Sequence, residues 1–184
     1  MFQIVLVGRP NVGKSTLFNR LVGPGKAIVN DQPGVTRDRK YGQVSFLDLE
    51  FMLVDTAGID DSLKGDTERE IKLQTEIAVR EADLIIFVID GRVGVLPTER
   101  AFSKYLIKTN KPTFVLVNKC EGSKGLVGLT ESNSLGFETI IPFSAEHGEG
   151  LSDLYDTLKQ QIEDKGNVSI SAENNIKTEN TKSE

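Results

Sequence analysis

Residues 8–15 read Gly8-Arg9-Pro10-Asn11-Val12-Gly13-Lys14-Ser15, which satisfies the GxxxxGKS/T pattern of a phosphate-binding loop. An apolar run at residues 2–7 precedes the loop and is typical of a buried strand. Residues 14–22 follow it with the apolar spacing of a helix. The backbone N–H groups of such a loop, together with the N-terminus of the next helix, form an anion site. The order strand, glycine loop, helix therefore predicts a site for nucleotide phosphates.

Two side chains of this loop have predicted chemical roles. The Lys14 ammonium is expected to reach the β- and γ-phosphates, and the Ser15 hydroxyl is expected to coordinate Mg²⁺. The loop by itself leaves ATPases, kinases and GTPases open. The other residues predicted to contact the phosphates are Gly8, Arg9, Pro10, Asn11, Val12, Gly13 and Thr16.

The composition excludes several classes of protein. With 22 basic and 27 acidic residues, the 184-residue chain has a net charge of −5. This argues against strong non-specific binding to nucleic acid, because affinity for the phosphate backbone needs clustered positive charge. A single cysteine excludes an internal disulfide and a cysteine-based zinc cluster. The longest apolar run, residues 84–89, is too short to span a bilayer. We expect a soluble cytoplasmic protein with no membrane partner, and an isolated domain that is monomeric.

Short apolar runs alternate with helical patterns along most of the chain, which favours an α/β fold. The predicted strands cover residues 2–7, 41–47, 50–54, 83–89, 113–117 and 138–142. Helices are predicted at residues 14–22, 68–80, 97–109 and 150–163, with a fifth inside 123–135 that glycine and serine interrupt. The sequence therefore predicts three layers: a mostly parallel six-stranded sheet with about five helices on its two faces. In such sheets, ligands bind at the carboxyl ends of the strands.

The composition changes at Lys165. The last 20 residues contain four apolar side chains and no aromatic one, so they cannot bury enough surface to offset the entropy of ordering. We expect a domain at residues 1–164 and a polar linker or disordered tail at 165–184.

A carboxylate is predicted beside the phosphate loop by the segment Asp55-Thr56-Ala57-Gly58, which ends the strand at 50–54. Asp55 is expected to hold Mg²⁺ through a water molecule, and the Gly58 N–H is expected to bond the γ-phosphate. Loss of that phosphate would release the following segment, which is how a nucleotide switch works. The alternative is a strand-end aspartate that caps a turn.

The segment Asn118-Lys119-Cys120-Glu121 follows the strand at 113–117 and resembles the guanine-recognition motif NKxD. A carboxylate in the last position accepts hydrogen bonds from guanine N1–H and the exocyclic amine, a donor pair that adenine lacks. This chain has glutamate there, and the extra methylene moves the carboxylate by about 1.3 Å. Cys120 is interpreted as a tolerated small residue between guanine-site residues. Ser144 and Ala145 match the loop that supports guanine from its other side.

These motifs resemble those of the Era-like group of TRAFAC-class GTPases, and most closely the first G domain of EngA (Der)-type double GTPases. The resemblance extends from residue 1 to about residue 164 and rests on residues 8–20, 33–42 and 144–150. It implies a Ras-like G domain that binds GTP or GDP with Mg²⁺, in which Thr36 completes the metal shell. It also implies a role in large ribosomal subunit assembly, with ribosome or rRNA contacts made only through the full-length protein. Because members of the family continue where this chain enters a linker-like tail, the resemblance implies that the chain is part of a longer protein, with a single-domain protein as the alternative.

The predicted catalytic residues are Lys14, Thr36, Gly58 and Asn11. Ile59 stands where Ras-type enzymes place the glutamine that orients the attacking water, so hydrolysis should be slow. The resemblance implies that Asn11 helps to coordinate a K⁺ ion that neutralises charge between the β- and γ-phosphates. Arg37 and Arg39 are candidates for a finger in cis, but solvated charges are the favoured interpretation.

The predicted function is a GTP-hydrolysing molecular switch with Mg²⁺ and K⁺ as cofactors. Two alternatives remain open at this point. One is a regulatory G domain that binds GTP with negligible turnover, which Ile59 and Glu121 make credible. The other is a phosphotransferase built on the same phosphate loop.

Overall fold

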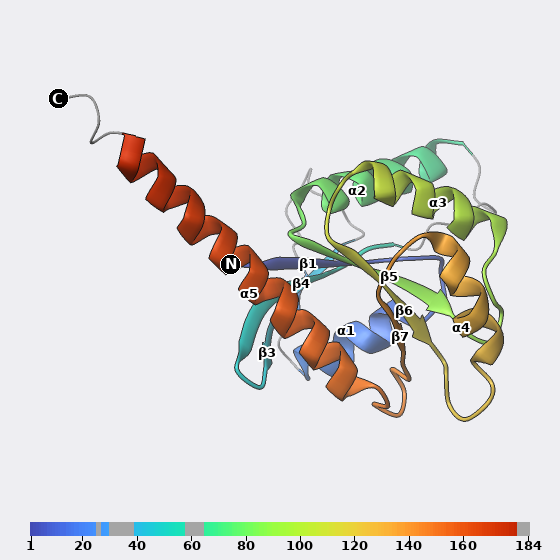
Figure 1. Cartoon of the computed structure of the whole chain (residues 1–184). Helices are drawn as coiled ribbons and strands as arrows, with labels where there is room; N and C mark the ends of the chain where they lie inside the picture. The colour runs from blue at the N-terminus through green and yellow to red at the C-terminus, as the bar shows by residue number, and fades with distance from the viewer. Residues whose placement is uncertain (25–26, 30–38, 58–64, 180–184) are drawn as a thin grey trace. The chain divides into compact units, whose positions relative to one another are not determined.

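A single sheet of seven strands organises the computed structural model, which describes residues 1–24, 27–29, 39–57 and 65–179 (Figure 1). The four strand pairs β1–β4, β1–β5, β5–β6 and β6–β7 are parallel, whereas β2–β3 and β3–β4 are antiparallel. In their spatial order the strands are β2 (Ala27–Val29), β3 (Lys40–Phe46), β4 (Leu49–Asp55), β1 (Gln3–Val7), β5 (Leu84–Asp90), β6 (Thr113–Asn118) and β7 (Ile140–Pro142).

The predicted mostly parallel α/β class is confirmed, and the described sheet has one strand more than the six expected. The additional strand, β2, has three residues and pairs antiparallel with β3 in the register Ala27↔Gly42. A strand of three residues is too short to show a hydrophobic pattern in the sequence, so only its pairing with β3 identifies it.

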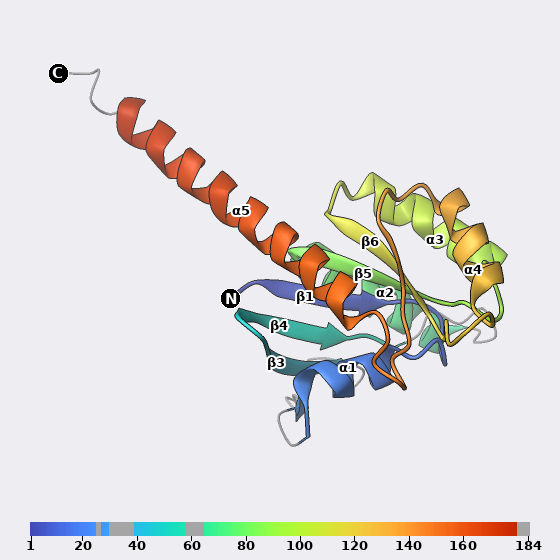
Figure 2. The same cartoon turned by 60° about the horizontal axis from the view of Figure 1, so that its bottom comes forward.

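Helices lie on both faces of the sheet, which gives the three expected layers (Figures 1 and 2). Helix α1 covers one face, while α2 and α3 lie on the other. The core on the α2 side contains Val7, Ile85 and Phe87 from the strands and Ala78 from α2. The helix bounds are α1 Lys14–Val22, α2 Asp66–Glu81, α3 Pro97–Lys108, and α4 Leu126–Ser132 with a 3₁₀ turn at Asn133–Leu135.

The beginning of α3 shows how local sequence sets an element's position. Pro97 occupies the first helical turn, where its missing N–H is not needed. The carboxylate of Glu99, three residues after the N-cap Leu96, accepts a hydrogen bond from the Leu96 N–H over 2.8 Å. The buried Glu99 also binds Arg9 of the phosphate loop at 3.0 Å, so this helix start is tied to the loop.

The last helix, α5, spans Leu151–Glu179 and extends beyond the 150–163 expected. Residues 152–184 form a unit separate from residues 1–151. The helix therefore enters the range that composition predicts to be a linker, and the domain boundary at residue 164 stays a prediction. Along the described residues, no helix combines the length and the apolar character needed to cross a membrane.

The sheet brings four chemically important chain segments to one edge. Strand β5 is buried at all seven positions, as a central strand covered on both faces should be. The parallel strands β1, β4, β5 and β6 end at Val7, Asp55, Asp90 and Asn118. The phosphate loop follows the first of these ends, so the expected ligand position coincides with this edge.

Candidate nucleotide-binding site

The phosphate loop connects β1 to α1 and packs against the ends of β5 and β6. Gly8 and Gly13 have positive φ values of +152° and +103°. A Cβ on Gly8 would lie 2.4 Å from the Val88 carbonyl oxygen, and one on Gly13 would lie 2.0 Å from Asn118 Nδ2. Both positions require glycine for two reasons, the backbone conformation and the lack of space.

Lys14 points back into the loop. Its side chain is buried, and its Nζ donates to the carbonyl oxygens of Gly8 at 3.1 Å and Arg9 at 2.7 Å. Burial lowers the pKa of Lys14 to about 8, with Asp55 raising it and Arg9 lowering it further. An ammonium held in a concave loop of backbone N–H groups is suited to bind phosphate oxygens, which would also restore its charge.

Ser15 and Asp55 form the metal-binding end of the site. The Ser15 hydroxyl donates to Asp55 Oδ2 over 2.8 Å. Asp55 is 5% exposed, and its Oδ1 has no hydrogen-bond partner among the described residues. Burial raises the pKa of Asp55, although the Ser15 bond and the nearby Lys14 and Lys40 act in the opposite direction. A buried carboxylate oxygen without a partner, next to a hydroxyl, is the oxygen chemistry that fits Mg²⁺.

The segment after β4 is anchored to β1. The Thr56 hydroxyl donates to the Leu6 carbonyl over 2.8 Å, which fixes the position of the chain after Asp55. Ala57 follows and is half-buried. Thr36 and Gly58, which were predicted as catalytic, and Ile59, which was predicted as a nucleotide-binding position, lie outside the described residues.

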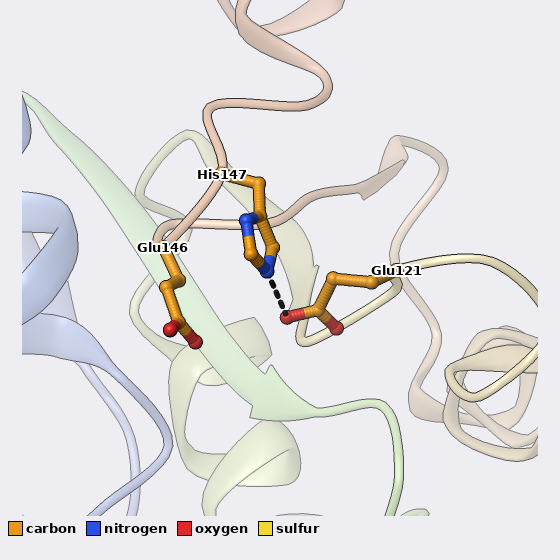
Figure 3. A group of neighbouring side chains, drawn as sticks. All are labelled: Glu121, Glu146 and His147. Carbon is orange, nitrogen blue, oxygen red and sulfur yellow. Dashed lines mark ion pairs between the residues drawn. The ribbon is translucent and has the colours of Figure 1, made fainter.

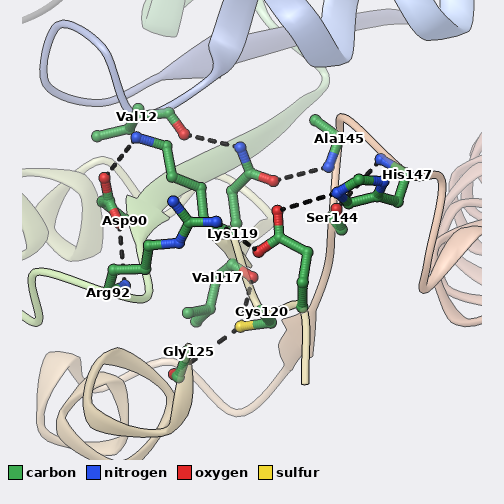
Figure 4. A network of polar contacts seen from close by, with 12 residues as sticks. Val12, Asp90, Arg92, Val117, Lys119, Cys120, Gly125, Ser144, Ala145 and His147 are labelled. Atoms are coloured by element: carbon green, nitrogen blue, oxygen red, sulfur yellow. Dashed lines mark hydrogen bonds and ion pairs between the residues drawn. The ribbon is translucent and has the colours of Figure 1, made fainter. Parts of the chain in front are cut away.

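Asn118 connects three segments of the site through hydrogen bonds to Val12 and Ala145, both of which are labelled in Figure 4. Its buried side chain donates from Nδ2 to the Val12 carbonyl at 2.8 Å and accepts at Oδ1 from the Ala145 N–H at 2.8 Å. The guanidinium of Arg20 donates to the carbonyls of Ala145 and Glu146 and so holds the same loop from α1. The phosphate loop, the end of β6 and the loop at residues 144–145 therefore form one connected unit.

Lys119 extends this unit to β5. Its Nζ donates to the Asn11 carbonyl at 2.8 Å and to Asp90 Oδ2 at 2.6 Å. Asp90 ends β5 and was not predicted as a site residue. Its position at the carboxyl end of a central strand is the signal that could have identified it.

Glu121 presents its carboxylate between two cationic or protonatable groups (Figures 3 and 4). Arg92 Nη2 lies 3.3 Å from Glu121 Oε2, and His147 Nε2 lies 3.8 Å from Glu121 Oε1. A hydrogen bond from its own backbone N–H lowers the pKa of Glu121, and Arg92 and the Ser144 hydroxyl contribute in the same direction. The carboxylate is therefore ionised and ready to accept hydrogen bonds.

A pocket of about 380 Å³ lies between these loops. This volume is within the range of ordinary small-molecule sites. The predicted residues that line it come from α1, from the end of β6 and from the segment that follows β6, whereas Arg92 and Glu146 line it without having been predicted. The lining residues are Thr16, Arg92, Asn118, Lys119, Glu121 and Glu146.

Ser144 and Cys120, two other predicted site residues, form contacts with neighbouring segments of the chain. Ser144 is buried, and its hydroxyl accepts a hydrogen bond from the His147 N–H at 3.2 Å. Cys120 does not line the pocket, and its Sγ lies 3.2 Å from the Val117 carbonyl. Burial raises the pKa of the Cys120 thiol. These positions agree with a structural part for both residues, and the individual roles of the site residues stay predictions.

Arg39 differs from the interpretation made from sequence. It is 5% exposed, and its guanidinium contacts Gln74 Oε1 at 2.8 Å and Glu81 Oε2 at 3.3 Å, both on α2. The prediction of a solvated charge was wrong, because partners on a distant helix compensate the burial of the cation. Within the described part of the chain, its guanidinium bonds Tyr41, Gln74 and Glu81 rather than the phosphate loop. Arg37 lies outside the described residues.

Known proteins are similar to this chain over most of its length. A family model described as 50S ribosome-binding GTPase matches residues 3–119. A GTPase Der from Azorhizobium caulinodans is 52% identical over 161 residues, which is 88% of this chain and 36% of that protein. A GTPase Der from Parvibaculum lavamentivorans is 50% identical over 159 residues, with 86% and 34% covered. The chain therefore spans about a third of the length of the curated relatives it matches.

Solved structures agree with the sequence matches. A variant of Aquifex aeolicus Era, bound to GDP and AlF₄⁻, has a TM-score of 0.72 at 30% identity and covers 86% of this chain and 56% of that one. The G domain of the T. maritima FeoB iron transporter has a TM-score of 0.68 at 25% identity, with 88% and 99% covered. The predicted resemblance to Era-like GTPases and to Der is thus confirmed. The family match over residues 3–119, together with this fold, shows that the chain belongs to the 50S ribosome-binding GTPase family.

Proposed function

We propose that this chain binds guanine nucleotides with Mg²⁺ and hydrolyses GTP as a molecular switch. The observation that carries the proposal is the connection of Asn118 to both Val12 and Ala145, with the ionised Glu121 carboxylate in the same pocket. Guanine N1–H and its exocyclic amine supply two donors to such a carboxylate. Adenine offers no such pair and would leave the carboxylate unpaired, which is the basis for rejecting ATP.

The phosphate end supports the same proposal. Lys14 and the N–H groups of the loop would hold the β- and γ-phosphates, while Ser15 directly and Asp55 through a water would hold Mg²⁺. When bound, the metal ion neutralises charge on the phosphate oxygens. Thr36 and the Gly58 N–H are proposed to complete the metal shell and the γ-phosphate contact, respectively.

Hydrolysis would proceed by attack of water on the γ-phosphorus. A new P–O bond forms to the water oxygen, the bond to the β–γ bridging oxygen breaks, and GDP and inorganic phosphate leave. Ile59 has no group that can orient the water, so we propose a slow intrinsic rate. We also propose that Asn11 binds K⁺, which is supported by its exposed position on the phosphate loop.

The biological setting is a separate part of the proposal. The matched family is described as ribosome-binding, and the relatives named GTPase Der are about two and a half times as long as this chain. We propose that a full-length protein containing this domain acts in large ribosomal subunit biogenesis in the cytoplasm and contacts ribosome or rRNA through other parts. The isolated domain is proposed to be monomeric.

A binding-only regulatory domain is the remaining alternative, because Ile59 and Glu121 depart from the usual motifs. The test has two arms. Displacement of a fluorescent GDP analogue by GDP, ADP and XDP measures base selectivity, and phosphate release under multiple turnover measures hydrolysis. Preference for GDP with phosphate release supports the proposal. Equal displacement by ADP would contradict guanine recognition, and selective binding without phosphate release would favour the binding-only domain.

A further inference from the structure

Arg92 lines the pocket of about 380 Å³, and three hydrogen bonds fix the backbone at this position. Its own N–H donates to Asp90 Oδ1 at 3.0 Å. The preceding Gly91 donates its N–H to the Asn118 carbonyl at 2.7 Å and accepts at its carbonyl from the Gly128 N–H at 2.9 Å. The starting point of the Arg92 side chain is therefore fixed relative to the end of β6 and to α4.

From this position the guanidinium reaches Glu121 from the solvent side. Nη2 lies 3.3 Å from Oε2, and the side chains are 46% exposed for Arg92 and 16% exposed for Glu121. Both residues line the 380 Å³ pocket. A half-exposed ion pair contributes little to folding stability, so its main consequence is the orientation of the carboxylate.

Glutamate at this position needs such an orienting partner more than aspartate does. Its side chain has one more rotatable bond, so fixing the carboxylate costs more conformational entropy. An ionised carboxylate has about four lone-pair positions. Arg92, the Glu121 N–H and the Ser144 hydroxyl use three of them, so the two donors of guanine take the free position and displace the bond from the Glu121 N–H or from Ser144. Arg92 and guanine can therefore contact the Glu121 carboxylate at the same time.

We propose that Arg92 is a specificity-determining positioning residue, which holds Glu121 Oε2 and so sets the longer carboxylate where it reads guanine. This inference rests on the proposed function, because it concerns the same pocket. An aspartate carboxylate would stop about 1.3 Å short of the glutamate position and lose the contact with Arg92. The contribution of Arg92 to the affinity for guanine nucleotides should therefore depend on the glutamate at position 121.

A double-mutant cycle on the full chain tests this dependence. The affinities for GDP, IDP and ADP are measured for the unchanged chain, for Arg92→Gln, for Glu121→Asp and for the double variant. IDP keeps N1–H but lacks the exocyclic amine, so the GDP-to-IDP ratio reports on the contact between that amine and the carboxylate. We expect Arg92→Gln to weaken GDP binding about tenfold and to reduce that ratio, as loss of a charged hydrogen bond would. In the Glu121→Asp background the same change should alter GDP affinity by less than about twofold.

Two further variants separate positioning from a general effect. Arg92→Lys keeps a cation on a flexible stem and should restore part of the lost GDP-to-IDP ratio. Arg100→Gln removes an equal charge from α3, where Arg100 bonds Ser134, and should leave the ratio unchanged. An unchanged GDP affinity in Arg92→Gln, or equal losses in both backgrounds, would overturn the inference. Failure of the proposed function is seen separately, as equal affinity of the unchanged chain for GDP and ADP.

Discussion

The Asn118 side-chain amide donates to the Val12 carbonyl at 2.8 Å and so fastens the end of β6 to the phosphate loop. Its other end accepts from the Ala145 N–H, and the whole side chain is buried. The base end and the phosphate end of the site are therefore held by one residue. A nucleotide meets a preorganised surface there, which reduces the ordering that binding requires.

Substitution of Asn118 should consequently affect stability and binding together. Asn118→Ala leaves the Val12 carbonyl and the Ala145 N–H buried without partners, at a cost of about 2–4 kcal/mol in the free energy of unfolding. Urea denaturation of the nucleotide-free chain measures this loss. Asn133 is the matched control, because its amide is exposed at the end of α4, and Asn133→Ala should change the unfolding free energy by less than about 0.5 kcal/mol. Equal effects of the two substitutions would contradict the role of Asn118 in connecting the end of β6 to the phosphate loop.

Asp55 should reduce the stability of the ligand-free protein at neutral pH. Burial raises its pKa above the ordinary value of 3.8, so the folded state favours the protonated form. The contribution of this group to stability is full below pH 3.8 and is lost as the pH rises through the folded pKa. Asp55→Asn removes the charge and should stabilise the metal-free protein at pH 7 by about 1 kcal/mol.

The pH dependence distinguishes this explanation from a general packing effect. The gain from Asp55→Asn should shrink as the pH is lowered toward 3.8, because the natural carboxyl then becomes neutral as well. The same variant should lose Mg²⁺-dependent nucleotide retention. Thermal unfolding of both proteins between pH 3.8 and pH 8, without nucleotide or Mg²⁺, is the measurement. A gain that does not vary with pH would contradict the role of the charge.

The fold and most of the site could be predicted because they depend on local patterns. The phosphate loop, the ends of β4 and β6 and the buried run of β5 are all visible within a few consecutive residues. Arg39 was misinterpreted because its partners, Gln74 and Glu81, lie on a helix that only the tertiary structure brings close. Arg92 was missed for the same reason, since its contact with Glu121 joins two loops that are 29 residues apart in sequence.

Lys14 should take up a proton when nucleotide binds under mildly alkaline conditions. Its pKa of about 8 in the ligand-free protein means that most molecules have lost the proton at pH 8.5. Phosphate oxygens favour the charged form and raise the pKa, so GDP binding at that pH should take up roughly 0.7 proton. At pH 7 the uptake by this group should fall to about 0.1 proton.

Isothermal titration calorimetry in buffers with different ionisation enthalpies measures this uptake. Lys14→Arg is the control, because a guanidinium stays charged and contributes no uptake at either pH. If the unchanged chain takes up no proton at pH 8.5, the lysine is already fully charged before the nucleotide arrives. The conclusion that burial lowers the pKa of Lys14 in the ligand-free protein would then be wrong.

Asn11 provides the most direct test of the proposed potassium dependence. It is exposed at the surface of the phosphate loop, with φ of +63°, and its carbonyl accepts a hydrogen bond from Lys119. The side-chain amide is therefore the part of Asn11 that is proposed to bind K⁺. We expect phosphate release to be faster in KCl than in NaCl at equal ionic strength, by about tenfold, because a fixed cation stabilises charge that develops on the phosphates.

Asn11→Ala would abolish the difference but would also strain the backbone at a positive φ. Asn11→Gly relieves that strain, so loss of the potassium effect in both variants, with GDP affinity retained, supports ion binding by the amide. A potassium effect that survives in Asn11→Gly would exclude this side chain as the ligand.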